Sequence, residues 1–324
     1  MPSSLKVGIV GYGQVAAFHA RLLREAGHDP LWIVGPVAGK AAAFARAYGF
    51  RRHGVEMAEM VGDPALDAVW ICSPNQVHAA QARRCLEAGK HVLVEVPLAM
   101  DATEGAELVA LADARGLVAA VGHNHRYLGG PTRVHDLIAA GDLDVISVYA
   151  RYLLMRRTNV GTNGYARSWT DSLLWHHGMH SVDLITWLLG VTLDDLPQVT
   201  ATGTTLGGTG TAPMDVTLAL TTSQGRAASL QLSYNSFQNI NDLVITGVEN
   251  TFGVFDGILR DRTGVVLDFS DDMLRGSDDA RRRLNREFVG AITDGAALLA
   301  TAASVLPALH VTQSAEEQLS VRPA

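Results

Sequence analysis

The sequence predicts an α/β protein with an N-terminal Rossmann doubly wound parallel sheet and a C-terminal α+β domain with an open, largely antiparallel sheet. Over about the first 122 residues, short apolar runs alternate with helical segments, which is typical of parallel strands with helices on both faces. A glycine-rich turn follows the first apolar run. Between residues 199 and 269, strand-like runs are separated by Gly, Asn and Asp, which indicates antiparallel pairing.

The order of these segments defines the elements that we expect. In the first part, strands are predicted at residues 5–10, 30–34, 68–71, 92–94 and 117–121, and helices at 13–27, 40–48, 77–88 and 102–115. In the second part, helices are predicted at residues 131–140, 172–189, 278–293 and 297–318, and strands at 145–154, 200–205, 215–222, 227–234, 243–247, 251–255 and 265–269. We expect domains at residues 1–122 and 123–324, with the last helices able to pack back on the first domain.

The composition argues against several classes of protein. The formal net charge of −7 is unfavourable for binding nucleic acid. No apolar run is long enough to span a membrane, and the start of the chain lacks the pattern of a signal peptide. Cys72 and Cys85 form no CxxC pair, so we expect neither a disulfide nor a thiolate zinc site. We therefore predict a cytoplasmic protein that acts on a small molecule, without nucleic-acid or membrane partners.

The glycine-rich turn has the sequence GYGQVA at residues 11–16. In a Rossmann fold the first glycine permits the tight turn, the second lets the backbone approach the pyrophosphate, and a small third residue allows close helix–strand packing. We assign cofactor binding to Gly11, Gly13, Gln14 and Val15. The alternative is a glycine-rich turn without a ligand, but the position directly after the first strand favours a dinucleotide.

The end of the second strand normally distinguishes NAD from NADP. An acidic residue there binds the ribose hydroxyl of NAD, whereas a basic residue accepts the additional phosphate of NADP. This chain has VGPVAGK at residues 34–40 and no carboxylate. We predict NADP, with Lys40 as a phosphate ligand and with NAD as the alternative; Lys40 could equally be a solvated lysine at the start of a helix.

Three further segments resemble one protein family. They are CSPNQVH at residues 72–78, KHVLVEVPLA at 90–99 and GMHSVD at 178–183. Together they resemble the glucose–fructose oxidoreductase and inositol dehydrogenase (Gfo/Idh/MocA) family, over essentially the whole chain. The resemblance implies NAD(P)-dependent oxidation of an alcohol, or the reverse reaction. It also implies cofactor contacts from Ser73, Pro74, Asn75, His78 and Glu95.

Two positions depart from the usual family pattern. Val96 stands where the family has a lysine that assists acid–base chemistry, and His176 stands where it has an aspartate. A valine cannot carry a proton, so the common sugar-dehydrogenase mechanism does not transfer unchanged.

A narrower resemblance accommodates both departures. The segments 155–159, 167–171 and 173–177 are similar to a branch of the family that oxidises the cyclic hemiacetal of 4-carboxy-2-hydroxymuconate-6-semialdehyde. That reaction gives 2-pyrone-4,6-dicarboxylate, with NADP as the hydride acceptor. His125 departs from this branch, because a second arginine is expected before Arg126.

The histidines near residue 180 are candidates for proton transfer. Oxidation of a hemiacetal requires a base for the hydroxyl proton, and histidine is suited to this near neutral pH. We assign His180 as the base because it aligns with the family's catalytic histidine, and His176, four residues earlier on the same helix face, as its partner or a substrate ligand. The alternative is that these are structural histidines. The HxxxH spacing also suits zinc, but no further ligand accompanies it, so we predict no metal.

Arginines in the second part are candidates for binding substrate carboxylates. Guanidinium groups bind carboxylates in bidentate fashion. We select Arg157 and Arg167, then Arg126, with Trp175 and His177 as further substrate contacts. The alternatives are solvated charges at strand ends and, for Trp175, a place in the core.

Other functions remain open from the sequence. One is a sugar or cyclitol dehydrogenase or ketoreductase of the same family. Another is a non-catalytic protein that senses dinucleotides, for which the missing lysine is the supporting feature. An open sheet with an apolar face commonly pairs with a second copy, so we also expect a homodimer or homotetramer.

Overall fold

The structure is a computed structural model that describes residues 4–158, 172–208, 212–275 and 277–320. These residues form two compact units. The first unit contains the chain up to Gly122 together with Arg281–Val305. The second contains the described residues of His123–Asn159, Thr170–Ala280 and the segment from Leu306 onwards.

The first unit is built on a six-stranded sheet with the strand order β3-β2-β1-β4-β5-β6. All of its strand pairs are parallel. The strands are β1 (Lys6–Val10), β2 (Asp29–Val34), β3 (Arg52–Gly54), β4 (Ala68–Ile71), β5 (His91–Val94) and β6 (Ala119–Val121). This order is that of a dinucleotide-binding Rossmann fold, which confirms the predicted doubly wound sheet.

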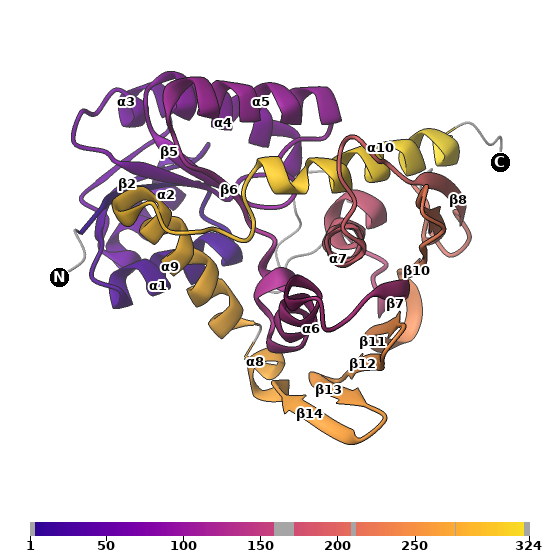
Figure 1. Cartoon of the computed structure of the whole chain (residues 1–324). Coiled ribbons are helices and arrows are strands. Elements are labelled where there is room, and N and C mark those ends of the chain that lie inside the picture. The colour runs from indigo at the N-terminus through magenta and orange to yellow at the C-terminus, as the bar shows by residue number, and fades with distance from the viewer. Residues whose placement is uncertain (1–3, 159–171, 209–211, 276, 321–324) are drawn as a thin grey trace. The chain divides into compact units, whose positions relative to one another are not determined.

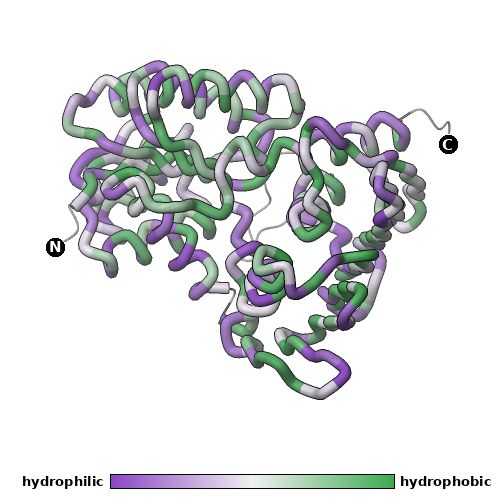
Figure 2. Tube along the Cα trace, in the orientation of Figure 1, coloured by the Kyte–Doolittle hydropathy of each residue, from purple (hydrophilic) through white to green (hydrophobic). Residues whose placement is uncertain are grey.

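Helices cover both faces of this sheet, with α1 and α2 on one side and α4 and α5 on the other (Figure 1). They are α1 (Gln14–Glu25), α2 (Ala38–Tyr48), α3 (Met57–Val61), α4 (His78–Glu87) and α5 (Ala102–Arg115). The central strands are buried on both faces, and Figure 2 shows them mostly in the green of hydrophobic residues. Strands of a parallel sheet read as continuous apolar runs for this reason.

The helix α9 (Asp278–Asp294) brings a distant part of the chain into the first unit. The guanidinium of Arg281 lies 5.1 Å from the ring of Phe18 on α1. Trp70 of β4 meets the edge of Phe288 at 5.1 Å between ring centroids. These contacts fix α9 against the Rossmann core.

The segment after α9 differs from the prediction. A helix was expected from residue 297, but residues 295–302 are not helical, and α10 begins only at Leu306. Instead, Val121 N donates to Ala300 O at 3.0 Å, and Ala302 N donates to Ala119 O at 2.8 Å. These bonds satisfy backbone groups along the edge strand β6 that would otherwise lack partners, which explains why local helical spacing was overridden.

The second unit is built on an eight-stranded sheet with the order β14-β13-β12-β11-β7-β10-β9-β8. Only the β10–β7 pair is parallel among the strand pairs described. The strands are β7 (Val145–Met155), β8 (Gln198–Thr204), β9 (Asp215–Thr221), β10 (Ala227–Ser233), β11 (Asn235–Gly247), β12 (Thr251–Phe255), β13 (Ile258–Asp261) and β14 (Gly264–Asp268). The largely antiparallel character was therefore predicted correctly.

Helices cover one face of this second sheet. They are α6 (Gly129–Ala140), α7 (Met179–Leu189) and α10 (Leu306–Ser320), with the short α8 (Ser270–Leu274) beside β14. In β9, buried and exposed residues alternate strictly, as expected when one face meets helices and the other does not. Tyr149 and Phe255 are exposed on the sheet, at 51% and 41%.

Candidate active site

The glycine-rich turn is fixed by close packing between β1 and β4. Gly11 has φ +97°, and a methyl group on it would lie 2.5 Å from the carbonyl oxygen of Cys72. Gly11 N also donates to Val34 O at 2.8 Å. Only glycine combines this backbone conformation with so close an approach, so the residue locks the turn at the carboxyl ends of three strands.

The first turn of α1 is open to a ligand. Gly13 is exposed, and a methyl group on it would meet no atom within 4 Å. No acidic side chain lies in this turn, and no side chain caps it. Backbone N–H groups at a helix N-terminus attract phosphate, so Gly13, Gln14 and Val15 fit a dinucleotide pyrophosphate. Ala16 is fully buried, which lets the helix pack closely on the sheet.

The end of β2 carries no carboxylate. Gly35 is buried, and the ring of Tyr12 occupies the space where its side chain would be. Lys40 lies exposed in the first turn of α2. Residues 34–40 contain no carboxylate that would repel an additional phosphate, and Lys40 supplies a cation in this segment.

The turn after β4 is held by His78. This imidazole is 1% exposed, with Nδ1 2.7 Å from Pro97 O and Nε2 2.8 Å from Ser73 O. Burial lowers the pKa of His78, although both carbonyl contacts oppose the shift. His78 thus connects the Ser73–Asn75 turn to the segment after β5, and the structure places it behind that turn rather than on the surface.

Glu95 lies directly after β5, at the carboxyl ends of the strands, where the glycine-rich turn also lies. Its side chain is 17% exposed, and Oε1 lies 2.8 Å from Nε2 of His19 on α1. Burial raises the pKa of Glu95, but the hydrogen bond and charge of His19 and the charges of Arg281 and His78 together outweigh burial, so the pKa lies below its usual value. The next residue, Val96, is 7% exposed.

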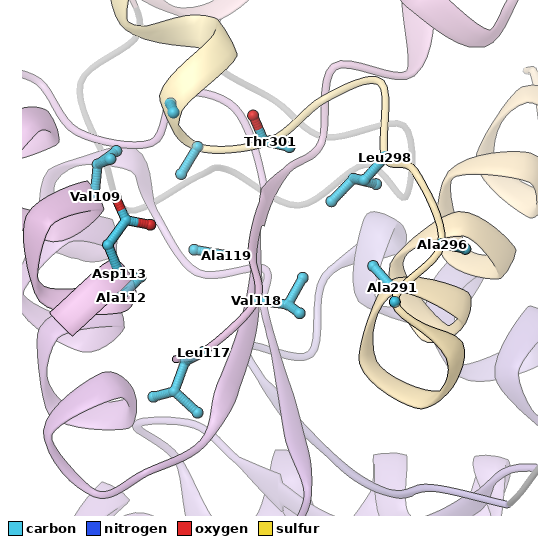
Figure 3. A pocket seen from close by; sticks show the side chains of 13 residues that line it. Val109, Ala112, Asp113, Leu117, Val118, Ala119, Ala291, Ala296, Leu298 and Thr301 are labelled. Carbon is cyan, nitrogen blue, oxygen red and sulfur yellow. The ribbon is translucent and has the colours of Figure 1, made fainter. Parts of the chain in front are cut away.

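A separate pocket in the first unit has a different character. Its volume is about 290 Å³, and it lies between α5, the start of β6 and the segment around residues 295–303 (Figure 3). The lining is mostly alanine and aliphatic, with Asp113 and Thr301 as polar members. Because dinucleotides bind at the carboxyl ends of the strands, we do not assign this pocket to the cofactor.

In the second unit, two histidine rings contact the ring of His180. The His180 ring stacks on His125 at 4.5 Å between centroids and meets the edge of His123 at 5.6 Å. His180 Nδ1 is buried without a hydrogen-bond partner among the residues described. Burial, and then the neighbouring histidines, lower the pKa of His180 well below its usual value. His180 is therefore neutral at neutral pH and able to accept a proton.

The residues 174–178 form a π-helical turn before α7, rather than the regular helix that was expected. The rings of His176 and His177 lie 4.0 Å apart in this turn. His177 Nδ1 lies 2.7 Å from the hydroxyl of Tyr234, and its ring stacks on Tyr152 at 5.2 Å. Such turns often occur at functional sites, and this one fixes His177 between two tyrosines.

Arg126 is held inside the second unit. It is 1% exposed, and its Nε and Nη2 donate to Asp183 Oδ2 and Oδ1 at 2.8 and 2.6 Å. His123 Nδ1 lies 3.3 Å from the same carboxylate, and the Arg126 guanidinium lies 5.3 Å from the ring of Trp187. Asp183 thus connects Arg126 to a ring that borders His180.

The remaining predicted substrate residues, and the neighbouring Arg156 that was not selected from the sequence, have distinct surroundings. The guanidinium of Arg156 lies 5.6 Å from the ring of Tyr234, which binds His177. Arg157 is exposed, and its Nη1 donates to Gly207 O. Trp175 is 4% exposed. Arg167 lies outside the described residues.

Two further observations concern the described part of the chain alone. No three His, Cys, Asp or Glu side chains there are arranged to hold a metal ion. No helix there has both the length and the apolar character needed to cross a bilayer.

Comparison with known proteins agrees with both units. A family model described as "Oxidoreductase family, NAD-binding Rossmann fold" matches residues 5–123. A second, "Bacterial oxidoreductases, C-terminal", matches residues 130–256. The chain belongs to the Gfo/Idh/MocA family of oxidoreductases. It is an NAD(P)-dependent dehydrogenase that acts on an alcohol or aldehyde group.

Individual relatives of this dehydrogenase have different substrates. The chain is 29% identical to 4-carboxy-2-hydroxymuconate-6-semialdehyde dehydrogenase of Sphingobium sp. strain SYK-6, over 97% of this chain and 99% of that protein. It is 30% identical to scyllo-inositol 2-dehydrogenase (NADP(+)) of Bacillus subtilis, over 58% of this chain and 52% of that protein. The structure of levoglucosan dehydrogenase with NADH and levoglucosan has the same fold, with a TM-score of 0.84 and 19% identity over 98% of this chain and 97% of that chain.

Sequence reasoning missed several side chains of these clusters. His19 contacts the predicted Glu95, and Tyr152 and Tyr234 contact the predicted His177, but all three lie far from them in sequence. Asn285 in turn contacts His19. His123 and Arg156 had a local signal, because each is close in sequence to a predicted residue. For Tyr234, 57 residues from His177, only the pairing of distant strands and helices could reveal the contact.

Proposed function

We propose that this dehydrogenase oxidises a carboxylated cyclic hemiacetal, such as that of 4-carboxy-2-hydroxymuconate-6-semialdehyde, to the corresponding lactone. The observation that carries the proposal is the group of histidines around a neutral His180, with Arg156 beside the Tyr234–His177 pair. A neutral base serves the chemistry, and a cationic side chain beside the tyrosine that binds His177 favours an anionic substrate.

In this proposal His180 takes the hydroxyl proton of the hemiacetal through Nε2. When bound by the first unit, NAD(P) would supply the acceptor for the hydride of the carbon that bears this hydroxyl. The low pKa of His180 keeps it in the accepting form, and a nearby carboxylate of the substrate stabilises the imidazolium that forms. His176 assists as a substrate ligand or proton partner.

Binding of the carboxylates is assigned to Arg156 and His177, together with the predicted Arg157 and Arg167. Arg156 lies next to the tyrosine that binds His177. Arg126 is already engaged by Asp183 on two atoms, so we give it a positioning role. The identity of 29% to a semialdehyde dehydrogenase over nearly the whole chain supports a substrate of this class.

For the cofactor, we propose that the first unit acts as the dinucleotide-binding domain and the second as the substrate domain. The open first turn of α1 receives the pyrophosphate through Gly11, Gly13, Gln14 and Val15. The turn at Ser73–Asn75 and Glu95 bind the nicotinamide half. Lys40 binds the additional phosphate of NADP, and His78 positions the Ser73–Asn75 turn.

The binding of product analogues tests the charge of the substrate. We expect 2-pyrone-4,6-dicarboxylate to bind the protein saturated with NADPH, as measured by isothermal titration calorimetry, at least about tenfold more tightly than unsubstituted 2-pyrone. The two compounds share the ring and differ in the carboxylates. Equal affinities, or tighter binding of a neutral cyclitol, would point to a sugar or cyclitol dehydrogenase instead.

We also propose a cytoplasmic homodimer or homotetramer, formed through the open face of the second sheet. A groove of about 430 Å³ on this face is lined by Tyr149, Gln231, Phe255 and the ion pair of Arg151 with Asp242. A sheet face with exposed aromatic side chains favours association with a second copy.

Mass measurement by light scattering tests this assembly. We expect the wild-type protein to have the mass of a dimer or tetramer and Tyr149→Glu to give a smaller species, because the charge would be buried at the interface. Leu274→Glu, at a residue that is 85% exposed on α8, should keep the wild-type mass. A monomeric wild-type protein would refute the assembly.

A further inference from the structure

Three buried side chains of the first unit form a chain of hydrogen bonds that ends at the partly exposed Glu95. Trp70 Nε1 donates to Asn285 Oδ1 at 2.7 Å, and His19 Nδ1 lies 3.0 Å from the same oxygen. His19 Nε2 lies 2.8 Å from Glu95 Oε1. Trp70 and His19 are fully buried, and Asn285 is 5% exposed.

The donors and acceptors in this chain fix the proton positions on His19. Indole N–H only donates, so the Asn285 atom that faces Trp70 must be its carbonyl oxygen. The same oxygen then accepts from Nδ1 of His19, which must carry a proton. Asn285 Nδ2 donates to Arg281 O at 3.0 Å, which agrees with this orientation of the amide.

The second nitrogen of His19 therefore faces a carboxylate. Because Nδ1 donates to Asn285, Nε2 is the nitrogen left to bond Glu95 Oε1, at 2.8 Å. The pKa of Glu95 lies below its usual value: burial raises it, but the contacts with His19 and the charges of Arg281 and His78 outweigh burial. Glu95 is thus a carboxylate at neutral pH, and His19 lies within hydrogen-bond distance of it.

The carboxylate is also confined on its other side. A methyl group on Gly122 would lie 2.7 Å from Glu95 Oε2, and Val96 N lies 3.4 Å from the same oxygen. Glu95 therefore has one well-defined position at the carboxyl end of β5, where the sheet binds its dinucleotide.

We propose that His19 is a positioning residue for the cofactor, which holds the Glu95 carboxylate in place and ionised by means of Asn285 and Trp70. This inference rests on the proposed assignment of Glu95 to the nicotinamide half of the site. Because oxidised nicotinamide is positively charged and reduced nicotinamide is neutral, a fixed carboxylate favours the oxidised cofactor. His19 thereby influences the relative affinity for the oxidised and the reduced cofactor, although its own side chain on α1 is fully buried.

A double-mutant cycle on cofactor binding tests the proposal without any substrate. Affinities for NADP+ and NADPH are measured by isothermal titration calorimetry for the wild-type protein, Glu95→Gln, His19→Phe and the double variant. We expect each single change to weaken NADP+ by about tenfold and NADPH by less than about twofold. The double variant should bind NADP+ no more weakly than Glu95→Gln alone, since His19 acts through Glu95.

Two further variants separate positioning from folding. His19→Gln keeps a side chain that can donate to Glu95, so it should recover part of the NADP+ affinity and remains informative if His19→Phe does not fold. Leu22→Ala changes a buried residue on the same helix; it should lower the melting temperature and leave the ratio of the two affinities unchanged.

Additive losses in the cycle, or equal losses for NADP+ and NADPH, would overturn the proposal and indicate a merely structural histidine. The outcome is independent of the substrate assignment, because no substrate is present. If His19 proved inert while the dicarboxylate bound as expected, this inference alone would fail.

Discussion

At the scale of single residues, the proposed proton transfer depends on His180. Its neutral state follows from burial and from the surrounding imidazoles, not from a carboxylate partner. A base of this kind has little tendency to be protonated before the substrate arrives. Its strength then depends on the charge of the substrate, which links proton transfer to carboxylate binding.

Replacing this base should strongly reduce turnover. We expect His180→Gln to lower kcat/KM by about 10²- to 10³-fold in steady-state assays, with a smaller effect on KM, because proton transfer contributes mainly in the transition state. His135→Gln, which alters a histidine stacked on Trp187, should remain within about threefold of wild type. Full activity of His180→Gln would exclude it as the base.

The same low pKa has a consequence for stability. The unfolded chain binds a proton on His180 near the usual pKa of 6.5, whereas the folded chain does not until the pH is well below this value. Unfolding is therefore favoured as the pH falls below 6.5, and His180 contributes up to about 1.4 kcal/mol for each pH unit. Denaturant unfolding measures the free energy of unfolding at about pH 7.5 and about pH 5.5. Between these two pH values, His180→Gln should lose less of this free energy than the wild-type protein. An equal loss would contradict the assigned direction of the pKa shift.

Arg156 provides the corresponding test for substrate charge. We expect Arg156→Ala to raise KM for a dicarboxylated substrate by about tenfold or more, and Arg156→Lys to have an intermediate effect, since lysine keeps the charge but not the bidentate geometry. Arg260→Ala removes a guanidinium from an exposed position on β13 and should leave KM unchanged. If Arg156→Ala and Arg260→Ala have the same KM for this substrate, Arg156 does not bind the substrate.

At the scale of elements, regular periodicity predicted most of the fold. The alternating segments of the first unit and the strand series of the second were identified because each buries apolar residues with a clear period. The short β3 and β13 were missed, since three or four residues give little periodic signal. The last helix was predicted to begin too early, at residue 297 instead of Leu306, because the segment around residue 300 forms backbone hydrogen bonds with the edge strand β6.

The candidate site was predictable only in part, because only some of its residues lie in local sequence motifs. Gly11, Glu95 and His180 lie in local motifs that can be read from the sequence. The π-helical turn at residues 174–178 changes the spacing of His176 and His177, which an ideal helix could not reveal. Contacts such as His19 with Asn285, 266 residues apart, depend on how the chain returns to the core.

The pairing of Asp183 with Arg126 joins α7 to the short helical segment before α6. Both side chains are almost completely buried. Removing one partner leaves an uncompensated charge, so we expect Asp183→Asn to lower the free energy of unfolding by about 3 kcal/mol. Asp136→Asn makes the same change at an exposed residue of α6 and should stay within about 0.5 kcal/mol of wild type. Chemical denaturation measures both, and equal stabilities would refute the structural role of the pair.

At the scale of the whole molecule, each unit contributes a different requirement of the reaction. The first presents an open helix N-terminus and a fixed carboxylate at one edge of a parallel sheet. The second presents a cluster of histidines, two tyrosines and arginines. The Gfo/Idh/MocA fold accommodates many substrates, so the substrate must be inferred from the side chains of the site and not from the fold.

The ratio of kcat/KM for two substrates tests the central claim most directly. With NADP as the cofactor, we compare the hemiacetal of 4-carboxy-2-hydroxymuconate-6-semialdehyde with scyllo-inositol, a neutral cyclic alcohol. We predict that the carboxylated substrate is favoured by about 10³-fold or more, because its carboxylates bind cationic groups that a neutral polyol leaves without a partner. Equal turnover of the two, or a preference for the polyol, would contradict it.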